Sequence, residues 1–413
     1  KMSSVIRDYS HLTIEDTFIT PEMSEHIDKE DYKYYYLNKE YKMPKQMKFY
    51  EPSEEVVRVT HSKKSSERMI FPHDGPWTEI EEDKYDDFLE YLDKIGASLP
   101  EVMNKRRTLR FLTANNYNNK KTWTNIEQHL DWREDIRPII LTTDMKKLID
   151  AGYMYIHGRD NNFRPLCFSN TKLLTQFDMD IDECIRVAWF LCFYMIDHLS
   201  IRGKVENWIF VSDLGGLSMS KIPTKQLKKF MVEAQDHLKG RVRKFFYFNT
   251  TFGLRAIWTM ISPFIDKMIK EKMVIKKDQT DEQLLELAHP SQIEEKYGGE
   301  AENVVQYWPP IKVSDEYGVD QDCIVGEVES EASLLDQENN SKSKKTKKSK
   351  KSKKSQKGAN APPVKMEDVV VEEAGHVVVN ETDGVGQAPP RGRESIKPIG
   401  GNTKDKGCTC TIF

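Results

Sequence analysis

Cysteine is scarce in this chain, and its six cysteines in 413 residues do not form the pattern of a disulfide framework. No C-x-x-C pair occurs, and the paired Cys and His spacings of zinc sites are absent. The sequence therefore indicates a reducing compartment and predicts no metal site.

Long apolar runs are missing as well. The longest one covers the ten residues 187–196, which is about half of the roughly 20 residues that a membrane-spanning helix needs. This run therefore predicts a buried helix. The first residues are polar and charged, so we expect no secretory signal. Together these absences favour a cytoplasmic protein.

The motifs of common enzyme classes are also lacking. The phosphate-binding pattern G-x-x-x-x-G-K-[ST] and the zinc motif H-E-x-x-H do not occur. The segment Gly216-Leu-Ser218-Met-Ser220 approaches the nucleophile elbow G-x-S-x-G but lacks the final glycine, which permits the sharp turn. We therefore expect no enzymatic activity and no cofactor apart from a bound ligand.

Acidic residues are absent from one short segment near the C-terminus. Residues 342–357 hold ten lysines and no acid, so the net charge of −4 conceals −14 on the rest of the chain. This tract predicts contact with an anionic membrane surface. A nuclear or nucleic-acid patch is the alternative, which we do not favour because no aromatic residue interleaves the lysines. Phosphorylation of the serines and threonine among them would then release the tract from membranes.

The last four residues are Cys410-Thr-Ile-Phe413, which fit the C-a-a-X prenylation motif. We expect Cys410 to carry a prenyl group, and Cys408 is a candidate for palmitoylation. One lipid chain binds membranes only marginally, so a second signal is needed for stable anchoring. The expected location is therefore the cytoplasmic face of a membrane.

Local periodicity divides the remaining chain into regions of different character. Helical patterns cover 78–96, 101–114 and 120–134, with Thr78 as N-cap and Gly96 as the stop. After residue 150, short apolar strands alternate with helices, which is typical of an α/β domain. Strands are expected at 153–157, 166–169, 208–212, 245–249 and 273–275, and helices at 181–200, 223–238, 253–270 and 281–288.

The expected domain boundaries follow from these patterns. We expect a poorly folded N-terminal strap (1–76), a helical lobe (77–137), an α/β domain (138–310), an acidic disordered linker (311–340), a polybasic segment (341–357) and a disordered tail (358–413).

Several motifs in a fixed order carry a family resemblance. They are Leu109-Arg110-Phe111-Leu112-x-Ala114-x-x-Tyr117, Trp132-Arg133, His157-Gly-Arg-Asp160-Asn-Asn-Phe163-Arg164-Pro165, Trp208-Ile-Phe-Val-Ser-Asp213-Leu-Gly215-Gly216, Arg241-x-x-Lys244-Phe-Phe-Tyr-Phe-Asn249 and Tyr297-Gly298-Gly299. This set, over about 230 residues, resembles the CRAL-TRIO lipid-binding family.

The resemblance implies a helical lobe and a mixed, mostly parallel sheet that encloses an apolar ligand pocket. It also implies that a mobile helix, here about 253–273, gates the pocket. The alternative is that the same residues simply pack on the sheet. The implied pocket and gate residues are Trp208, Phe210, Phe246, Phe252, Leu254, Ile257, Trp258, Ile261, Phe264 and Ile265.

The resemblance implies a headgroup site that this chain matches only in part. Arg241 and Lys272 match the basic residues of the phosphatidylinositol-transfer branch, whereas Gly240 replaces its glutamate. Asn115 and Asn116 replace a basic pair, and an amide donates hydrogen bonds without supplying charge. An inositol phospholipid, another phospholipid and a non-phospholipid therefore all remain open as ligands, and surface charge remains the alternative for Arg241 and Lys272.

Two classes of function follow from these implications. The first is membrane-tethered, non-enzymatic binding or transfer of a phospholipid or another hydrophobic molecule. The alternative is a scaffold or adaptor that uses the domain and the tail for protein interaction. A protein that regulates a kinase by presenting a lipid to it would be compatible with the first class of function.

Overall fold

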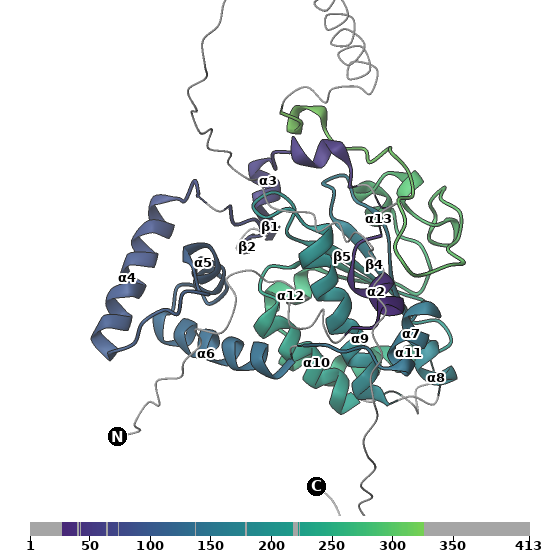
Figure 1. Ribbon diagram of the computed structural model, residues 1–413, viewed down its shortest axis with the longest axis horizontal. Coiled ribbons are helices and arrows are strands. Elements are labelled where there is room, and N and C mark those ends of the chain that lie inside the picture. Colours follow the sequence, from purple (N-terminus) through teal and green to yellow (C-terminus); the bar gives the residue numbers. More distant parts are fainter. Residues whose placement is uncertain are drawn as a thin grey trace, which may run out of the picture. The chain divides into compact units, whose positions relative to one another are not determined.

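The computed structural model describes residues 27–325, apart from 39–40, 42, 63–64, 73, 137, 178–179, 218–221 and 223. Within this part, Figure 1 shows a helical lobe formed by α4, α5 and α6, and a sheet covered by helices. The lysine tract, Cys408 and Cys410 lie outside the described residues, so the expectations about them stay predictions.

The helical lobe consists of α4 (Glu79–Ile95), α5 (Lys105–Ala114) and α6 (Asn119–Ile136). Thr78 and Glu81 form a reciprocal capping box at the start of α4, and Gly96 ends this helix in the left-handed conformation, with φ 70°. The predicted start and end of α4 are confirmed. The lobe has its own apolar core, which contains Phe88, Leu92, Leu109, Leu112, Ile126 and Leu130.

The α/β domain is built on a five-stranded sheet, and the order of its strands in space is the order in the sequence. β3 pairs antiparallel with β4, and the remaining neighbours are parallel. The predicted class, α/β with a mixed, mostly parallel sheet, is therefore confirmed. The strands are β3 (Met154–Arg159), β4 (Pro165–Asn170), β5 (Trp208–Asp213), β6 (Val242–Phe248) and β7 (Met273–Ile275).

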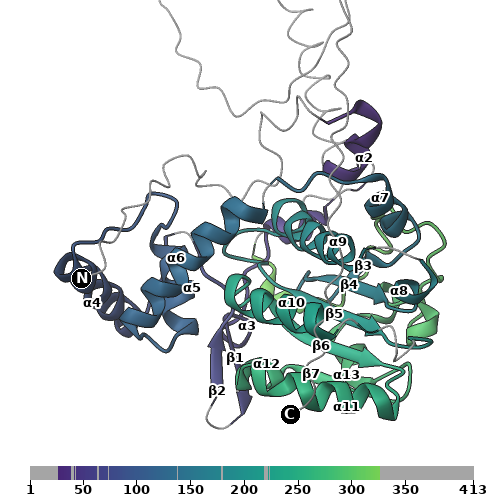
Figure 2. The ribbon, with the colours of Figure 1, turned by 90° about the horizontal axis from the view of Figure 1, so that it is seen from below.

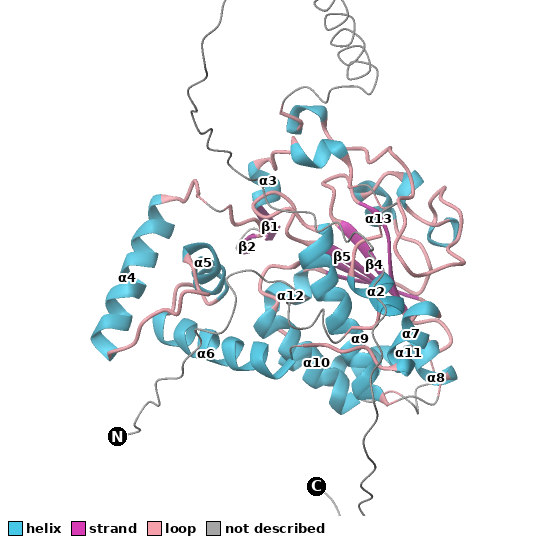
Figure 3. Cartoon of the chain, viewed as in Figure 1, coloured by secondary structure: helices cyan, strands magenta, loops and turns pink. Residues whose placement is uncertain are grey.

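Helices cover both faces of this sheet, as a mostly parallel sheet requires. Figure 2 shows α9 and α10 lying across one face, and Figure 3 separates helices from strands by colour. The helices of the domain are α7 (Thr143–Asp150), α8 (Leu173–Gln176), α9 (Ile181–Tyr194), α10 (Thr224–His237), α11 (Phe252–Ile261), α12 (Lys267–Glu271) and α13 (Glu282–Leu287).

Two of the predicted helices differ from the observed ones. The helix expected at 181–200 ends as α9 at Tyr194 and continues as a π-helical turn over Met195–Leu199. The helix expected at 253–270 is broken into α11, a 3-10 turn over Ser262–Phe264, and α12. Pro263 explains this break, because proline cannot donate a backbone hydrogen bond and its ring clashes with the preceding turn.

The N-terminal segment packs against the domain, which corrects the expectation of poor folding for its described part. Tyr34 stacks on Trp308, and Tyr35 contacts Phe190 edge to face. Further along, α3 (Glu54–Val57) leads into a β-hairpin formed by β1 (Arg58–Ser62) and β2 (Ser65–Arg68).

The folded part also continues beyond the boundary expected at residue 310. Tyr317 and Val319 are buried in a cluster with Met47, Tyr50 and Phe163. The acidic composition after residue 311 suggested a linker, but these apolar residues contact the N-terminal segment, so residues 311–325 belong to the fold.

Candidate functional site

A cavity of about 300 Å³ lies between one face of the sheet and the helices that cover it. α9, α10, α11 and α12 all contribute side chains, and most of the lining is apolar. This volume falls at the lower end of the roughly 300–1,000 Å³ typical of small-molecule pockets. Such a cavity suits a hydrophobic molecule or the apolar part of one.

The sheet contributes to this cavity through alternate residues of its strands. Trp208 and Phe210 of β5 line the cavity, as do Phe245 and Tyr247 of β6. Phe246 lies between the last two and points to the opposite face, where it packs in a second core. It therefore does not line the cavity, because successive side chains of a strand alternate between faces.

The resemblance implied that Phe246 lines the pocket, but residues 245–248 of β6 are all aromatic, so residue type does not show which of them face the cavity. The register supplies the missing information, since Phe210 pairs with Phe245 and Val211 with Phe246. Paired residues on neighbouring strands point to the same face of the sheet. Phe245 therefore faces the cavity with Phe210, and so does Tyr247, two residues further along β6. Both could have been identified as lining residues once the strand pairing was known.

The segment 253–273, here called the gate segment, forms one wall of the cavity. Leu254, Ile257, Trp258, Ile261 and Ile265 line it. They recur at helical spacing, which places them on the inner face of α11 and the turn after it. This wall also packs against Leu227 and Met231 of α10.

Two expected gate residues lie elsewhere. Phe252, the first residue of α11, is 89% exposed. Phe264 is 47% exposed, and the Lys228 ammonium lies 3.1 Å from its ring centroid. Neither side chain is part of the cavity lining. A helix turns only one face toward the cavity, and Phe252 in α11 and Phe264 in the following turn lie on the exposed side.

Three basic residues line the cavity, Arg241, Arg255 and Lys272, and the end next to Lys272 is here called the basic end. The Lys272 side chain is only 1% exposed, and its Nζ lies 2.6 Å from a carboxylate oxygen of Glu67 on β2. It also donates a 3.0 Å hydrogen bond to the Val242 carbonyl. Lys272 is therefore a buried member of an ion pair, not a surface charge.

The Glu67 carboxylate is held from a second side by His61 of β1. His61 Nε2 lies 3.1 Å from Glu67 Oε2. Burial acts to raise the pKa of Glu67, but the hydrogen bond with His61 and the charge of Lys272 outweigh it and hold that pKa below its usual value. Glu67 is thus ionised at neutral pH.

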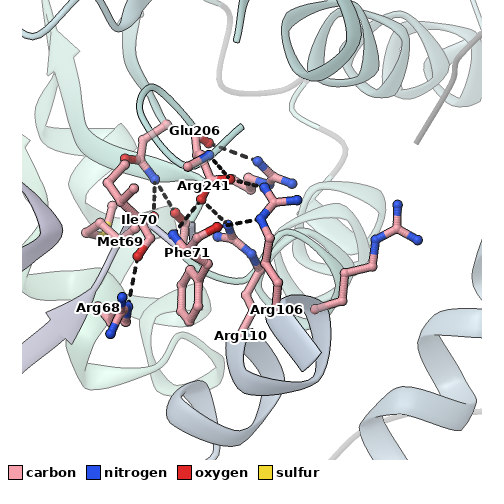
Figure 4. Close-up of polar contacts among 12 residues, drawn as sticks. Arg68, Met69, Ile70, Phe71, Arg106, Arg110, Glu206 and Arg241 are labelled. Carbon is pink, nitrogen blue, oxygen red and sulfur yellow. Dashed lines mark hydrogen bonds and ion pairs between the residues drawn. The ribbon is translucent and has the colours of Figure 1, made fainter. Parts of the chain in front are cut away.

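Arg241 belongs to a polar cluster that joins the lobe, the N-terminal segment and the sheet (Figure 4). Its Nη1 donates a 3.1 Å hydrogen bond to the Glu206 carbonyl. The Glu206 side chain is fully buried and pairs with Arg106 and with Arg110, the latter at 2.7 Å. The same carboxylate accepts from the backbone N–H of Phe71 at 2.8 Å.

Asn115 and Asn116 lie at the end of α5 in the helical lobe, and neither lines the cavity. Asn115 is 3% exposed, and its Nδ2 and Oδ1 have no hydrogen-bond partner among the described residues. Asn116 is exposed and has φ 51°. The structure therefore does not bring these two amides together with Arg241 and Lys272 around the cavity.

Glu67 is the residue that the sequence reading missed. A Cβ built at Gly240 would lie 3.8 Å from Glu67 Oε1 and 3.2 Å from Arg110 Nη1. The Glu67 carboxylate of β2 therefore lies next to the position at which the resemblance implies a glutamate. No local signal marks Glu67, because it belongs to a hairpin in a segment without sustained periodicity.

Two kinds of feature are absent from the described part of the chain. No group of three or more His, Cys, Asp or Glu side chains there is arranged to hold a metal ion. Among the helices described, none has the length and apolar character required to cross a membrane.

The fold and the cavity define a class of protein, an α/β protein with an internal apolar cavity. Residues 149–299 match the family model described as the CRAL/TRIO domain. This match confirms the resemblance for that part of the chain. Proteins of this family bind lipids or other small hydrophobic molecules.

Individual relatives are distant. The SEC14 cytosolic factor of Yarrowia lipolytica is 24% identical over 224 residues, which cover 48% of this chain and 44% of that protein. Patellin-6 of Arabidopsis thaliana is 22% identical over 228 residues, or 51% of this chain and 54% of that protein. The chain thus spans about half the length of these two relatives. The crystal structure of Sfh5 has a TM-score of 0.42 and 14% identity, and covers 64% of this chain and 98% of that one.

Proposed function

We propose that this protein binds and transfers a hydrophobic molecule, without catalysis, in the cavity closed by the gate segment. The observation that carries the proposal is the composition of that cavity. It is lined mostly by apolar side chains from the sheet and four helices, and Lys272 at its basic end is neutralised by Glu67. Burial of an apolar ligand there is favoured by about 25 cal/mol for each Å² removed from water.

Exchange of such a ligand requires the cavity to open toward a membrane. The outer face of the gate segment suits contact with a membrane interface, because Phe252 and Met260 are 89% and 60% exposed. Lys267 and Lys270 are exposed on the same segment and carry the charge that attracts anionic lipids. We propose that the gate segment is the part of the domain that touches the membrane during exchange.

The tail forms a second part of the proposal. Prenylation of Cys410 and contact of the lysine tract with anionic lipid would keep the domain near a cytoplasmic membrane face. The mass of the C-terminal peptide from the native protein tests this directly. An unmodified peptide ending in Phe413 would contradict the tethering.

The experiment for the cavity is uptake of a fluorescent lipid from vesicles, combined with native mass spectrometry of the purified full chain. A co-purified hydrophobic molecule is expected in a one-to-one complex. Replacing Ala234, which lines the cavity, with Trp should fill the space and abolish uptake. Ala256→Trp is the matched control, because Ala256 is exposed on α11.

The scaffold alternative makes the opposite prediction. A protein that uses this domain only for protein interaction would purify with an empty cavity. It would also take up no lipid, with or without the Ala234→Trp change. Uptake that Ala234→Trp leaves intact would show that the ligand binds elsewhere and would contradict the proposed site.

A further inference from the structure

The end of the cavity next to Lys272 is closed by charges of the protein itself. The Lys272 ammonium has three N–H donors. One position is taken by the Glu67 carboxylate at 2.6 Å and another by the Val242 carbonyl at 3.0 Å. The Lys272 side chain is only 1% exposed, so its ammonium group is hardly accessible to a ligand.

The Glu67 carboxylate is held in place by the fold around it. β2 pairs antiparallel with β1, which brings His61 to 3.1 Å from Glu67. Val59 and Met69, on either side of this hairpin, are buried in a small apolar cluster. A Cβ built at Gly240 would make an ordinary van der Waals contact with Glu67 Oε1, at 3.8 Å, so the carboxylate lies directly beside this glycine.

Four of the six side chains in the cavity lining that carry a hydroxyl group, all except the two tyrosines, are engaged with protein partners. Ser169 and Ser212 share a 2.9 Å hydrogen bond. Thr171 donates to the Asp213 carbonyl at 2.8 Å, and Thr250 donates to the Lys276 carbonyl at 2.7 Å. Because these groups are already paired, the cavity does not require a polar ligand to satisfy them.

An anionic group placed beside Lys272 would meet an unfavourable environment. It would have to lie close to the Glu67 carboxylate or displace it, and two like charges within a few ångströms oppose each other's ionisation. Displacement would leave Glu67 buried without its strongest cationic partner, which is costly. An uncharged molecule avoids both penalties.

We infer that the cavity takes an uncharged apolar molecule, and that Glu67 determines this specificity by excluding a phosphate or carboxylate from the Lys272 end. The inference rests on the proposed function, since it assumes that the cavity holds a ligand. It selects, among the ligands left open by the sequence, a molecule without an anionic headgroup.

The test compares two probes that differ only in a phosphate. Phosphatidylcholine vesicles carry either a fluorescent diacylglycerol or a phosphatidic acid with the same labelled acyl chain, and uptake by the full chain is measured. The wild-type protein should favour the diacylglycerol by about tenfold or more, which corresponds to about 1.4 kcal/mol. This comparison needs no variant, so it does not depend on the folding of one.

Variants then assign the effect to Glu67. In Glu67→Gln, Lys272 loses its counter-charge, so uptake of phosphatidic acid should rise and the preference should fall about tenfold, or about 1.4 kcal/mol. The double variant Glu67→Gln with Lys272→Met removes both charges and should restore the preference for diacylglycerol. Glu54→Gln is the control, because Glu54 lies in the same segment, is 76% exposed and pairs with Arg58.

Each outcome separates this inference from the proposed function. Equal uptake of both probes by the wild-type protein would overturn the inference and leave the proposed function standing. An unchanged preference in a folded Glu67→Gln variant, checked by circular dichroism, would also overturn it. Failure of the wild-type protein to take up either probe would overturn the proposed function and the inference with it.

Discussion

Replacing Glu206 with Gln should lower the free energy of unfolding by about 3–5 kcal/mol, the usual cost of breaking a buried ion pair by removing one partner. The Glu206 side chain is fully buried and pairs with Arg106 and Arg110, which are themselves 9% and 8% exposed. Removing one negative charge therefore leaves two nearly buried guanidinium groups without their shared counter-charge.

The position of Glu206 adds to this cost. Its carboxylate also accepts hydrogen bonds from the backbone N–H groups of Phe71 at 2.8 Å and Gly203 at 3.1 Å. A glutamine keeps only one acceptor oxygen, so at least one of these donors loses its partner. Each unpaired buried donor costs about 1–3 kcal/mol.

The assay is urea unfolding of the full chain, followed both by tryptophan fluorescence and by far-ultraviolet circular dichroism. Coincident transitions justify a single free energy of unfolding. Glu51→Gln is the matched control, because Glu51 is 56% exposed and its pair with Lys204 should contribute at most about 1 kcal/mol. A loss of less than about 1 kcal/mol in Glu206→Gln would refute the reasoning.

Three further predictions concern pH and exchange. Folding lowers the pKa of Glu67 below 4.5, so the ionised carboxylate contributes fully to stability at neutral pH. This contribution is lost as the pH falls through the lowered pKa. The free energies of unfolding of the wild type and Glu67→Gln should therefore converge in acid. Burial lowers the pKa of His237 from 6.5 to about 4, so stability should rise with pH between these values, and His237→Phe should flatten that rise in unfolding measurements. Replacing Phe252 and Met260 with Asp should slow lipid transfer between vesicles while leaving a bound ligand in place, and an unchanged transfer rate would exclude the outer face of the gate segment from membrane contact.

Much of the fold could be predicted because its signals are local. The capping box at Thr78 and the left-handed Gly96 follow directly from residue type, and β7 begins and ends where the sequence placed it. The break of the gate helix at Pro263 was also readable, since proline ends a helical pattern. That signal was outweighed by the apolar periodicity on both sides of it.

The candidate site was less predictable because it depends on pairing between distant segments. Trp208 and Phe210 were expected in the pocket and line it, whereas Phe246 was assigned to the wrong face. Asn115 and Asn116 were expected at the headgroup site but lie in the lobe, away from the cavity lining. The positions of the site residues depend on strand register and on the path of the N-terminal segment. Neither can be predicted from the periodicity of apolar residues within one segment.

The sequence by itself determined most of the secondary structure and the resemblance to a family. Those features depend on the periodicity and chemistry of neighbouring residues. Only the tertiary structure decided that Glu67 neutralises Lys272 and that Glu206 joins the lobe to the sheet. An ion pair requires its two charges to lie within a few ångströms, and for residues so far apart in the chain that distance is set by the packing of the whole fold.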